Sequence, residues 1–133
     1  MYSIEHIKAL KARALDKGFS LPKGFKHTST RSLQLVYNGI GAEWMPKFII
    51  KLITWAWEKA EAPAMVHDYE YIMADKKYWN FLVANMRMVY NSFLNRTPVS
   101  GMLGGLICGI FGWRAFKEAD LNTVLAKYTP EEI

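Results

Sequence analysis

The stretch from Ala62 to Tyr71, Ala-Pro-Ala-Met-Val-His-Asp-Tyr-Glu-Tyr, decides how the rest of the chain is interpreted. Pro63 suits the first turn of an α-helix, because its φ is already helical and no backbone N–H is needed there. His67 and Tyr71 are four residues apart and therefore share one face of such a helix, whereas Asp68 is rotated from His67 by about 100°. The stretch predicts a helix from residue 62 to about residue 74 that presents side chains in two neighbouring directions.

Helical signals continue on both sides of this stretch. Ser3 is a suitable N-cap for an amphipathic helix that Gly18 ends, and Pro46 suits the first turn of another. Ser100 is placed to cap a glycine-rich apolar helix near the C-terminus. The expected helices are 1–18, 46–57, 62–74, 78–94 and 99–116. Because the two helices over 62–94 hold the candidate chemistry, we expect them to pack at the centre of a mainly α domain.

The segment between residues 19 and 44 is punctuated by proline and glycine. Gly39 and Gly41 predict a glycine-rich loop, because glycine allows backbone conformations that other residues avoid. The apolar run from Leu33 to Tyr37 favours at most one short strand or hairpin. The fold class expected is a small helical domain with this loop, and the candidate site region spans residues 37–94.

The composition predicts one folded domain over residues 1–133. Of these residues 51% are hydrophobic, which is ample apolar material for one core. Cys108 is the only cysteine, so an intramolecular disulfide framework and a cysteine-rich zinc site are excluded. The net charge of +5 favours anionic partners, although solubility is the simpler interpretation. Nucleic acid is an unlikely partner, because the basic residues are scattered and form no dense run.

Two features bear on membranes. No signal peptide is expected, because Glu5 and the basic residues between Lys8 and Arg13 interrupt any apolar run. The apolar run 99–113 is shorter than the roughly 20 residues that cross a bilayer. Within it, the glycines 101, 105 and 109 repeat every four residues and form a strip that lets another backbone approach closely. We expect a buried core helix, with a membrane-inserting or oligomer-forming segment as the alternative.

The residues around His67 allow a calcium site. Calcium takes about six to eight oxygen ligands and accepts carboxylates, carbonyls and waters together. Asp68 with the backbone carbonyls near Gly39 and Gly41 would supply such a set. The alternative is structural: His67 is an ordinary helix histidine bonded to a carbonyl or to the Tyr71 hydroxyl.

The order of three segments resembles the phospholipase A2 superfamily, particularly its disulfide-free viral members. These segments are Gly39-Ile40-Gly41, the stretch 62–71, and Ala84-Asn85-Met86-Arg87-Met88. The resemblance implies that the glycine loop and Asp68 bind Ca²⁺ and that His67 activates a water to attack a phospholipid ester. It also implies that Tyr71 helps to hold a group on the next helix that orients His67. The glycine-rich segment 104–116 is similar to one that follows in some viral members.

A second resemblance overlaps the first. The segments Leu21-Pro22-Lys23-Gly24-Phe25, Thr28-Ser29-Thr30-Arg31-Ser32 and His67-Asp68-Tyr69-Glu70-Tyr71 are similar to those of small uncharacterised bacteriophage proteins. Those proteins often carry an acidic residue after the threonine and another in the second helix, and both places are non-acidic here. The resemblance implies a phage or viral origin, with the virion or the host cytoplasm as the location.

Asn85 stands where the phospholipase pattern has an aspartate. An asparagine can accept a hydrogen bond from His67, but it supplies no charge to stabilise the imidazolium that forms during catalysis. We therefore favour a phospholipase A2-like protein with a degenerate site that serves in the virion or in interactions. Its partners would be other virion proteins or further copies of itself, with a phospholipid membrane surface as an alternative. The competing hypothesis is an active calcium-dependent phospholipid ester hydrolase with His67 as general base.

Overall fold

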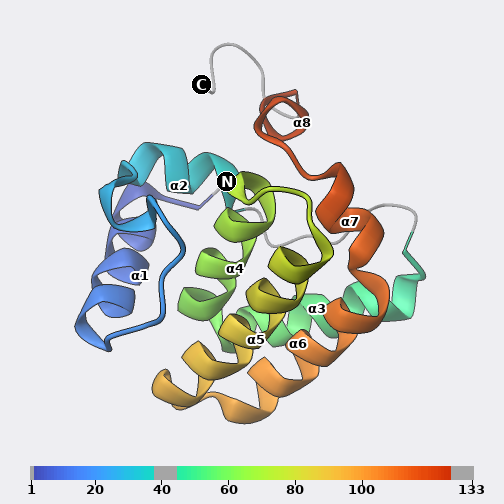
Figure 1. The fold of residues 1–133 in the computed structure, drawn as a ribbon. Coiled ribbons are helices and arrows are strands. Elements are labelled where there is room, and N and C mark those ends of the chain that lie inside the picture. The colour runs from blue at the N-terminus through green and yellow to red at the C-terminus, as the bar shows by residue number, and fades with distance from the viewer. Residues whose placement is uncertain (1, 38–44, 127–133) are drawn as a thin grey trace.

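The computed structural model describes residues 2–37 and 45–126, and these residues form helices joined by short turns (Figure 1). The helices are α1 (Ile4–Asp16), the 3₁₀ helix η1 (Phe25–His27), α2 (Thr30–Val36), α3 (Lys47–Lys59), α4 (Glu61–Met73), α5 (Tyr78–Leu94), α6 (Pro98–Phe111), α7 (Trp113–Glu118) and α8 (Leu121–Leu125). Within the described ranges no residue is in a strand. The mainly α prediction is confirmed.

The start and end of α1 follow the sequence signals. The Ser3 hydroxyl accepts a hydrogen bond from the backbone N–H of His6 at 3.1 Å, and the N-terminus of the helix is thereby capped. Gly18 follows the helix with φ +67°, a left-handed conformation that glycine adopts without strain. The sequence identified no partner for His6, but its Nε2 lies 2.9 Å from Glu61 Oε2 at the start of α4.

The strand expected at residues 33–37 is wrong, because most of this run forms the C-terminal part of α2. Ser29 caps α2 by accepting a hydrogen bond from the backbone N–H of Ser32 at 3.1 Å. Leu33 and Val36 lie three residues apart on the helix and are both buried. A short apolar run fits either a helix or a strand, and here the capping residue and the burial of one face decide for the helix.

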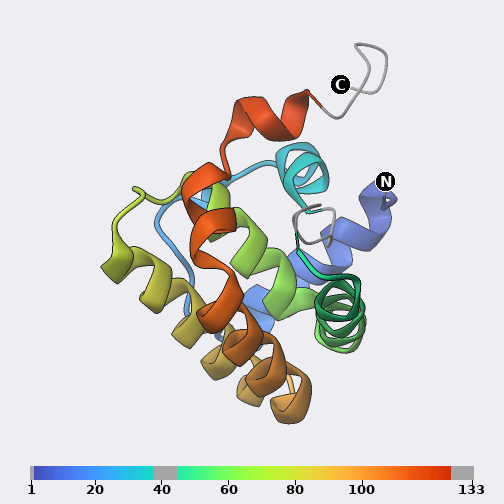
Figure 2. The ribbon, with the colours of Figure 1, turned by 90° about the vertical axis from the view of Figure 1, so that its right-hand side faces the viewer.

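Helix α4 is the centre of the molecule. It packs against α1 and α2 on one side and against α5 on the other, and α6 lies between α5 and α3 (Figures 1 and 2). Most residues of α4 are buried, including Met65, His67 and Tyr71. A helix that is buried nearly all round holds its polar side chains away from water, so these side chains need partners inside the protein.

Two glycines of the strip on α6, Gly101 and Gly105, are packed against α5, whereas Gly109 is exposed. A methyl group built on Gly101 would lie 2.0 Å from Ser92 Cβ, and one built on Gly105 would lie 2.6 Å from Val89 Cγ2. The close approach that the glycine spacing predicts therefore occurs within the chain, between α5 and α6. Nowhere in the described ranges is a helix both long enough and apolar enough to cross a bilayer.

The helix expected over residues 99–116 is divided into α6 and α7. The break falls at Gly112, whose backbone N–H donates to the Cys108 carbonyl at 2.7 Å. Ser100 does not cap α6, because the helix begins earlier with Pro98 in its first turn and Thr97 as N-cap. Proline is favoured in the first turn, where no backbone N–H is needed, and it sets the start of the helix here.

Candidate functional site

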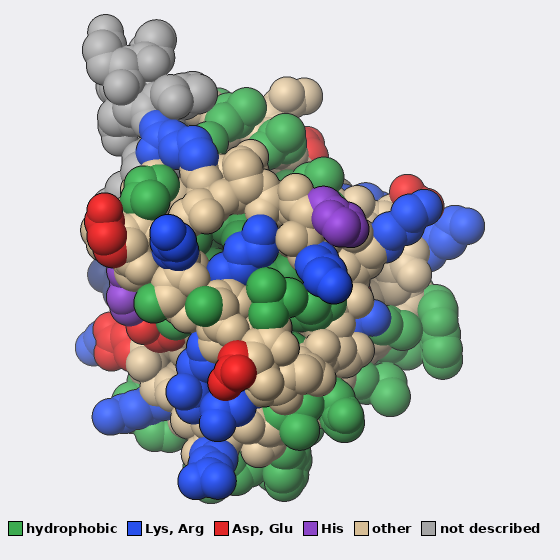
Figure 3. Space-filling model, turned by 90° about the vertical axis from the view of Figure 1, so that its left-hand side faces the viewer, with side chains coloured by type: hydrophobic (Ala, Val, Ile, Leu, Met, Phe, Trp, Pro, Cys, Tyr) green, Lys and Arg blue, Asp and Glu red, His purple; other side chains and the backbone are tan. Residues whose placement is uncertain are grey.

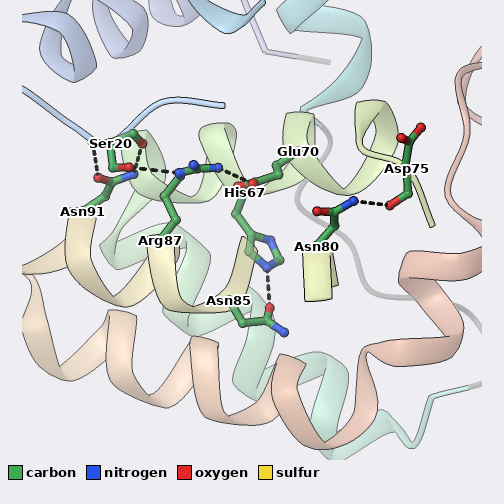
Figure 4. A network of polar contacts seen from close by, with 8 residues as sticks. All are labelled: Ser20, His67, Glu70, Asp75, Asn80, Asn85, Arg87 and Asn91. Carbon is green, nitrogen blue, oxygen red and sulfur yellow. Dashed lines mark hydrogen bonds and ion pairs between the residues drawn. The ribbon is translucent and has the colours of Figure 1, made fainter. Parts of the chain in front are cut away.

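Helices α4 and α5 bring three predicted residues together. The His67 ring nitrogen Nε2 lies 2.9 Å from Asn85 Oδ1, as Figure 4 shows. The hydroxyl of Tyr71, one turn further along α4, donates to the same Asn85 oxygen at 2.9 Å. A single amide oxygen on α5 thus accepts from two side chains on one face of α4.

These contacts fix the protonation of one ring nitrogen. Since the Asn85 carbonyl oxygen can only accept, His67 carries a hydrogen on Nε2. The other ring nitrogen, Nδ1, lies 3.8 Å from Asp68 Oδ1, which is too long for a hydrogen bond and short enough for charge attraction. Asn85 orients the imidazole, while the nearest carboxylate stands on its opposite side.

The His67 imidazole is enclosed by aromatic rings. It is only 2% exposed, and the indole of Trp57 meets it edge-on with the ring centres 5.2 Å apart. The Tyr71 ring lies 4.1 Å from the imidazole, centre to centre, and the Cys108 thiol interacts with both. Burial alone lowers the pKa of His67, but interactions with Asp68 and Cys108 outweigh it and raise the pKa to about 10. The imidazole therefore holds its proton more tightly than a free histidine does.

Asp68 is held by α3. The indole N–H of Trp57 donates to Asp68 Oδ1 at 3.1 Å, and the carboxylate is 18% exposed. Burial raises the pKa of the Tyr37 hydroxyl, and the nearby Asp68 charge raises it further. The sequence reasoning missed Trp57 and Tyr37 as neighbours of this carboxylate.

The described residues alone do not make a calcium site. Among the described residues, the Asp68 carboxylate contacts an indole N–H and an imidazole, whereas calcium needs several oxygen ligands. Over the described ranges, no three His, Cys, Asp or Glu side chains are grouped as metal ligands. Gly39 and Gly41, the other predicted ligands, lie outside the described residues. The calcium site therefore stays a prediction.

A second polar network lies one turn along the same two helices. Arg87 on α5 forms an ion pair with Glu70 on α4, and its Nε donates to the Ser20 hydroxyl at 3.0 Å (Figure 4). The side-chain amide of Asn91 accepts from the Ser20 backbone N–H at 2.8 Å and donates to the Ser20 carbonyl at 2.9 Å. This network ties the segment after α1 to α5, so Arg87 has a structural partner and is not directed at a free phosphate.

Comparisons with known proteins found no relative. No family model, no curated protein and no solved structure matches this chain significantly. The interpretation of the site therefore depends on its own geometry.

Proposed function

We propose that this protein is a non-catalytic, phospholipase A2-like interaction protein that assembles with other components of a virus particle. The observation that carries the proposal is the enclosure of His67, which is 2% exposed and hydrogen-bonded to the neutral Asn85. A general base must give up its proton near neutral pH and reach a water. An enclosed imidazole with a raised pKa meets neither condition.

The network has a sufficient structural role without catalysis. A buried polar group that loses its partner costs about 1–3 kcal/mol. The two hydrogen bonds that Asn85 Oδ1 accepts from His67 and Tyr71 therefore stabilise the α4–α5 contact. His67 Nδ1 and Asn85 Nδ2 make no hydrogen bond with the described residues. The surface, by contrast, carries the features of an interaction protein. Large apolar side chains on α5 and α6 are more than half exposed, which is typical of a binding surface.

One observation favours the competing hydrolase. His67 is oriented by a side chain from the following helix, and Tyr71 supports that same side chain. This is the arrangement that the phospholipase A2 resemblance implies, with Asn85 in the place of an aspartate. In a hydrolase of this kind, His67 would serve as general base and Asp68 as a Ca²⁺ ligand, and the ion would stabilise the oxyanion.

Phospholipid hydrolysis separates the two functions. The purified chain is incubated with phosphatidylglycerol vesicles and calcium, and released fatty acid is measured for wild type, His67→Ala and Asn85→Asp. We expect the wild type to release no more than His67→Ala, because the imidazole reaches no water. We expect Asn85→Asp to stay inactive as well, since the carboxylate would restore charge without opening the site.

Fatty acid release by the wild type that disappears both with chelator and in His67→Ala would establish the hydrolase. Release by Asn85→Asp alone would mean that the missing charge, and not the enclosure, silences the site. In either case the enclosure of His67 would not prevent catalysis, and the proposed non-catalytic function would be wrong.

A further inference from the structure

An apolar surface covers the outer side of α5 and α6, and we call it the α5–α6 face. Its members, each more than half exposed, are Trp79, Met86, Tyr90, Phe93, Val99, Met102, Leu106 and Ile110. In Figure 3, hydrophobic side chains gather along the lower right edge of the molecule, and Lys and Arg side chains lie beside them. The hairpin thus presents an apolar surface with no helix over it in the described ranges.

The exposed apolar side chains of α5 and those of α6 form one continuous face. At the contact between the helices, Val89 and Ser92 of α5 lie against Gly105 and Gly101 of α6. The residues that follow these four in the chain are exposed members of the face: Tyr90, Phe93, Leu106 and Met102. One residue corresponds to a rotation of about 100° on a helix. Because α5 and α6 run antiparallel, moving one residue along the chain from the contact turns toward the same side of the hairpin on both helices. The exposed side chains of α5 and those of α6 therefore lie on one side.

The face has the area of a stable interface. Its eight side chains are between 54% and 71% exposed. Large side chains offer up to roughly 150–250 Å² each, so the face presents on the order of 1,000 Å². Each partner in a standard protein complex buries about 800 Å². The apolar area is therefore sufficient for stable association.

The composition of the face indicates a protein and not a lipid surface. Helix α6 contains no charged residue, and the one charged residue of α5, Arg87, is 19% exposed and is paired with Glu70. Helices that lie on a bilayer are rich in Lys and Arg beside their apolar side, whereas α5 and α6 together contain one basic residue, Arg87. Tryptophan, tyrosine, phenylalanine and methionine without charges are typical of the core of protein interfaces.

We infer that a second copy of this chain covers the α5–α6 face, so that two hairpins form a four-helix bundle about a two-fold axis. The inference rests on the proposed interaction role and names its partner. A hairpin with one uncovered apolar side is half of such a bundle, and an isologous pair buries the same surface on both copies. Because the face is uncharged, two copies meet without repulsion at its centre.

The ends of the hairpin fit the same arrangement. A two-fold axis that lies in the plane between the two faces and perpendicular to the helices places the α5–α6 turn of one copy over the open end of the other hairpin. The turn carries the exposed Arg96, and the open end carries the exposed Asp75 together with Lys77. At the open end, Asp75 offers the arginine of the second copy an opposite charge, beside Lys76 and Lys77.

Sedimentation velocity tests the inference on the full chain between about 1 µM and about 100 µM. We expect a wild-type dimer with a Kd of about 1 µM or lower. Leu106→Asp is expected to weaken it by about 100-fold or more, because a two-fold interface contains the substituted residue twice. Phe48→Asp is the matched control, since Phe48 is an apolar residue of α3 with 64% exposure that lies outside the face. It should change the Kd by less than about threefold.

Met86→Lys on α5 provides an independent variant should Leu106→Asp fail to fold, which far-UV circular dichroism would reveal. A wild type that remains monomeric throughout this concentration range overturns the inference, as does a dimer that both variants leave intact. Binding of a monomeric wild type to phosphatidylglycerol vesicles, lost in Leu106→Asp, would assign the face to a lipid surface and also overturn it. A monomer that hydrolyses no phospholipid leaves the proposed function standing with another partner, so the two failures are distinguishable.

Discussion

Asn85 connects the two central helices through one oxygen atom. Its side-chain carbonyl accepts from His67 and from Tyr71, each at 2.9 Å. A carboxylate in this position would attract the imidazolium from the α5 side. With an amide there, the attraction comes from Asp68, which lies next to His67 in the chain and across the ring from Asn85. The pKa of His67 is thus raised by Asp68 on α4 and by Cys108 on α6, and α5 contributes only orientation.

The raised pKa of His67 predicts a stability that depends on pH. Burial alone lowers this pKa, but Asp68 and Cys108 raise it from 6.5 to about 10. A group whose pKa is higher in the folded state stabilises fully below its unfolded pKa, and the effect is lost as the pH rises through the folded value. Relative to His67→Gln, the free energy of unfolding of the wild type should therefore fall between about pH 6.5 and pH 10, by up to about 1.4 kcal/mol per pH unit.

Urea unfolding of both proteins across this range measures the difference. His27→Gln is the matched control, because it removes an exposed histidine and should leave the pH dependence of the wild type unchanged. Parallel curves for the wild type and His67→Gln would show that His67 is neutral in the folded protein and would remove this part of the argument against catalysis.

The sequence could predict which residues of the site share one helix face, but not which residues of other helices contact them. Helical spacing places His67 and Tyr71 together, and the resemblance adds Asn85 on the next helix. Trp57 and Cys108 were missed, because they reach His67 from α3 and α6. Which residues of those helices point inward depends on packing between helices, and neither residue carries a local signal for it.

Helix α6 has two different sides, because Gly101 and Gly105 face α5 and large apolar side chains face outward. The spacing of its glycines predicted a close approach correctly but could not say whether the partner was within the chain. For residues 33–37 the sequence did not predict the correct secondary structure. Their apolar run was too short to decide between a strand and a helix, and the Ser29 cap that decides it lies upstream.

The glycine positions of α6 make a matched pair of substitutions. At Gly101 an added methyl would lie 2.0 Å from the Ser92 side chain, whereas at Gly109 it would meet nothing within 4 Å. We expect Gly101→Ala to lower the free energy of unfolding by about 1–3 kcal/mol, because the two helices must separate. Gly109→Ala should raise it by roughly 0.5–1 kcal/mol, because alanine favours the helix more than glycine does.

Denaturant unfolding of the two variants beside the wild type gives both numbers. Equal effects at the two positions would contradict the packing of α5 on α6. A bulky residue at Gly105, where Val89 is 2.6 Å from the added methyl, would likewise disturb this packing. A loss of assembly in such a Gly105 variant could therefore result from misfolding. A substitution of the exposed Leu106 tests the α5–α6 face without disturbing this packing.

The charge distribution of the whole molecule follows the helices. The 42 residues from Lys76 to Lys117 contain no aspartate or glutamate, although the chain has 12. Among the described acidic residues, Glu70 and Glu61 pair with Arg87 and His6. The sequence could show that the segment lacks acids, but only the fold shows that its two helices join their apolar sides into one surface.

Association through that surface would make the stability of each chain depend on concentration. If the dimer unfolds to two separate chains, mass action raises the midpoint of thermal unfolding as protein is added. A hundredfold increase stabilises each chain by about 1.4 kcal/mol, which for a chain of this size corresponds to a Tm increase of about 5 °C. Differential scanning calorimetry of the wild type should show this increase, and Leu106→Asp should show none, because its monomer unfolds alone. A wild-type Tm that does not change over this range would mean that folding and association are independent, and the α5–α6 face would then contribute nothing to holding the folded chain together.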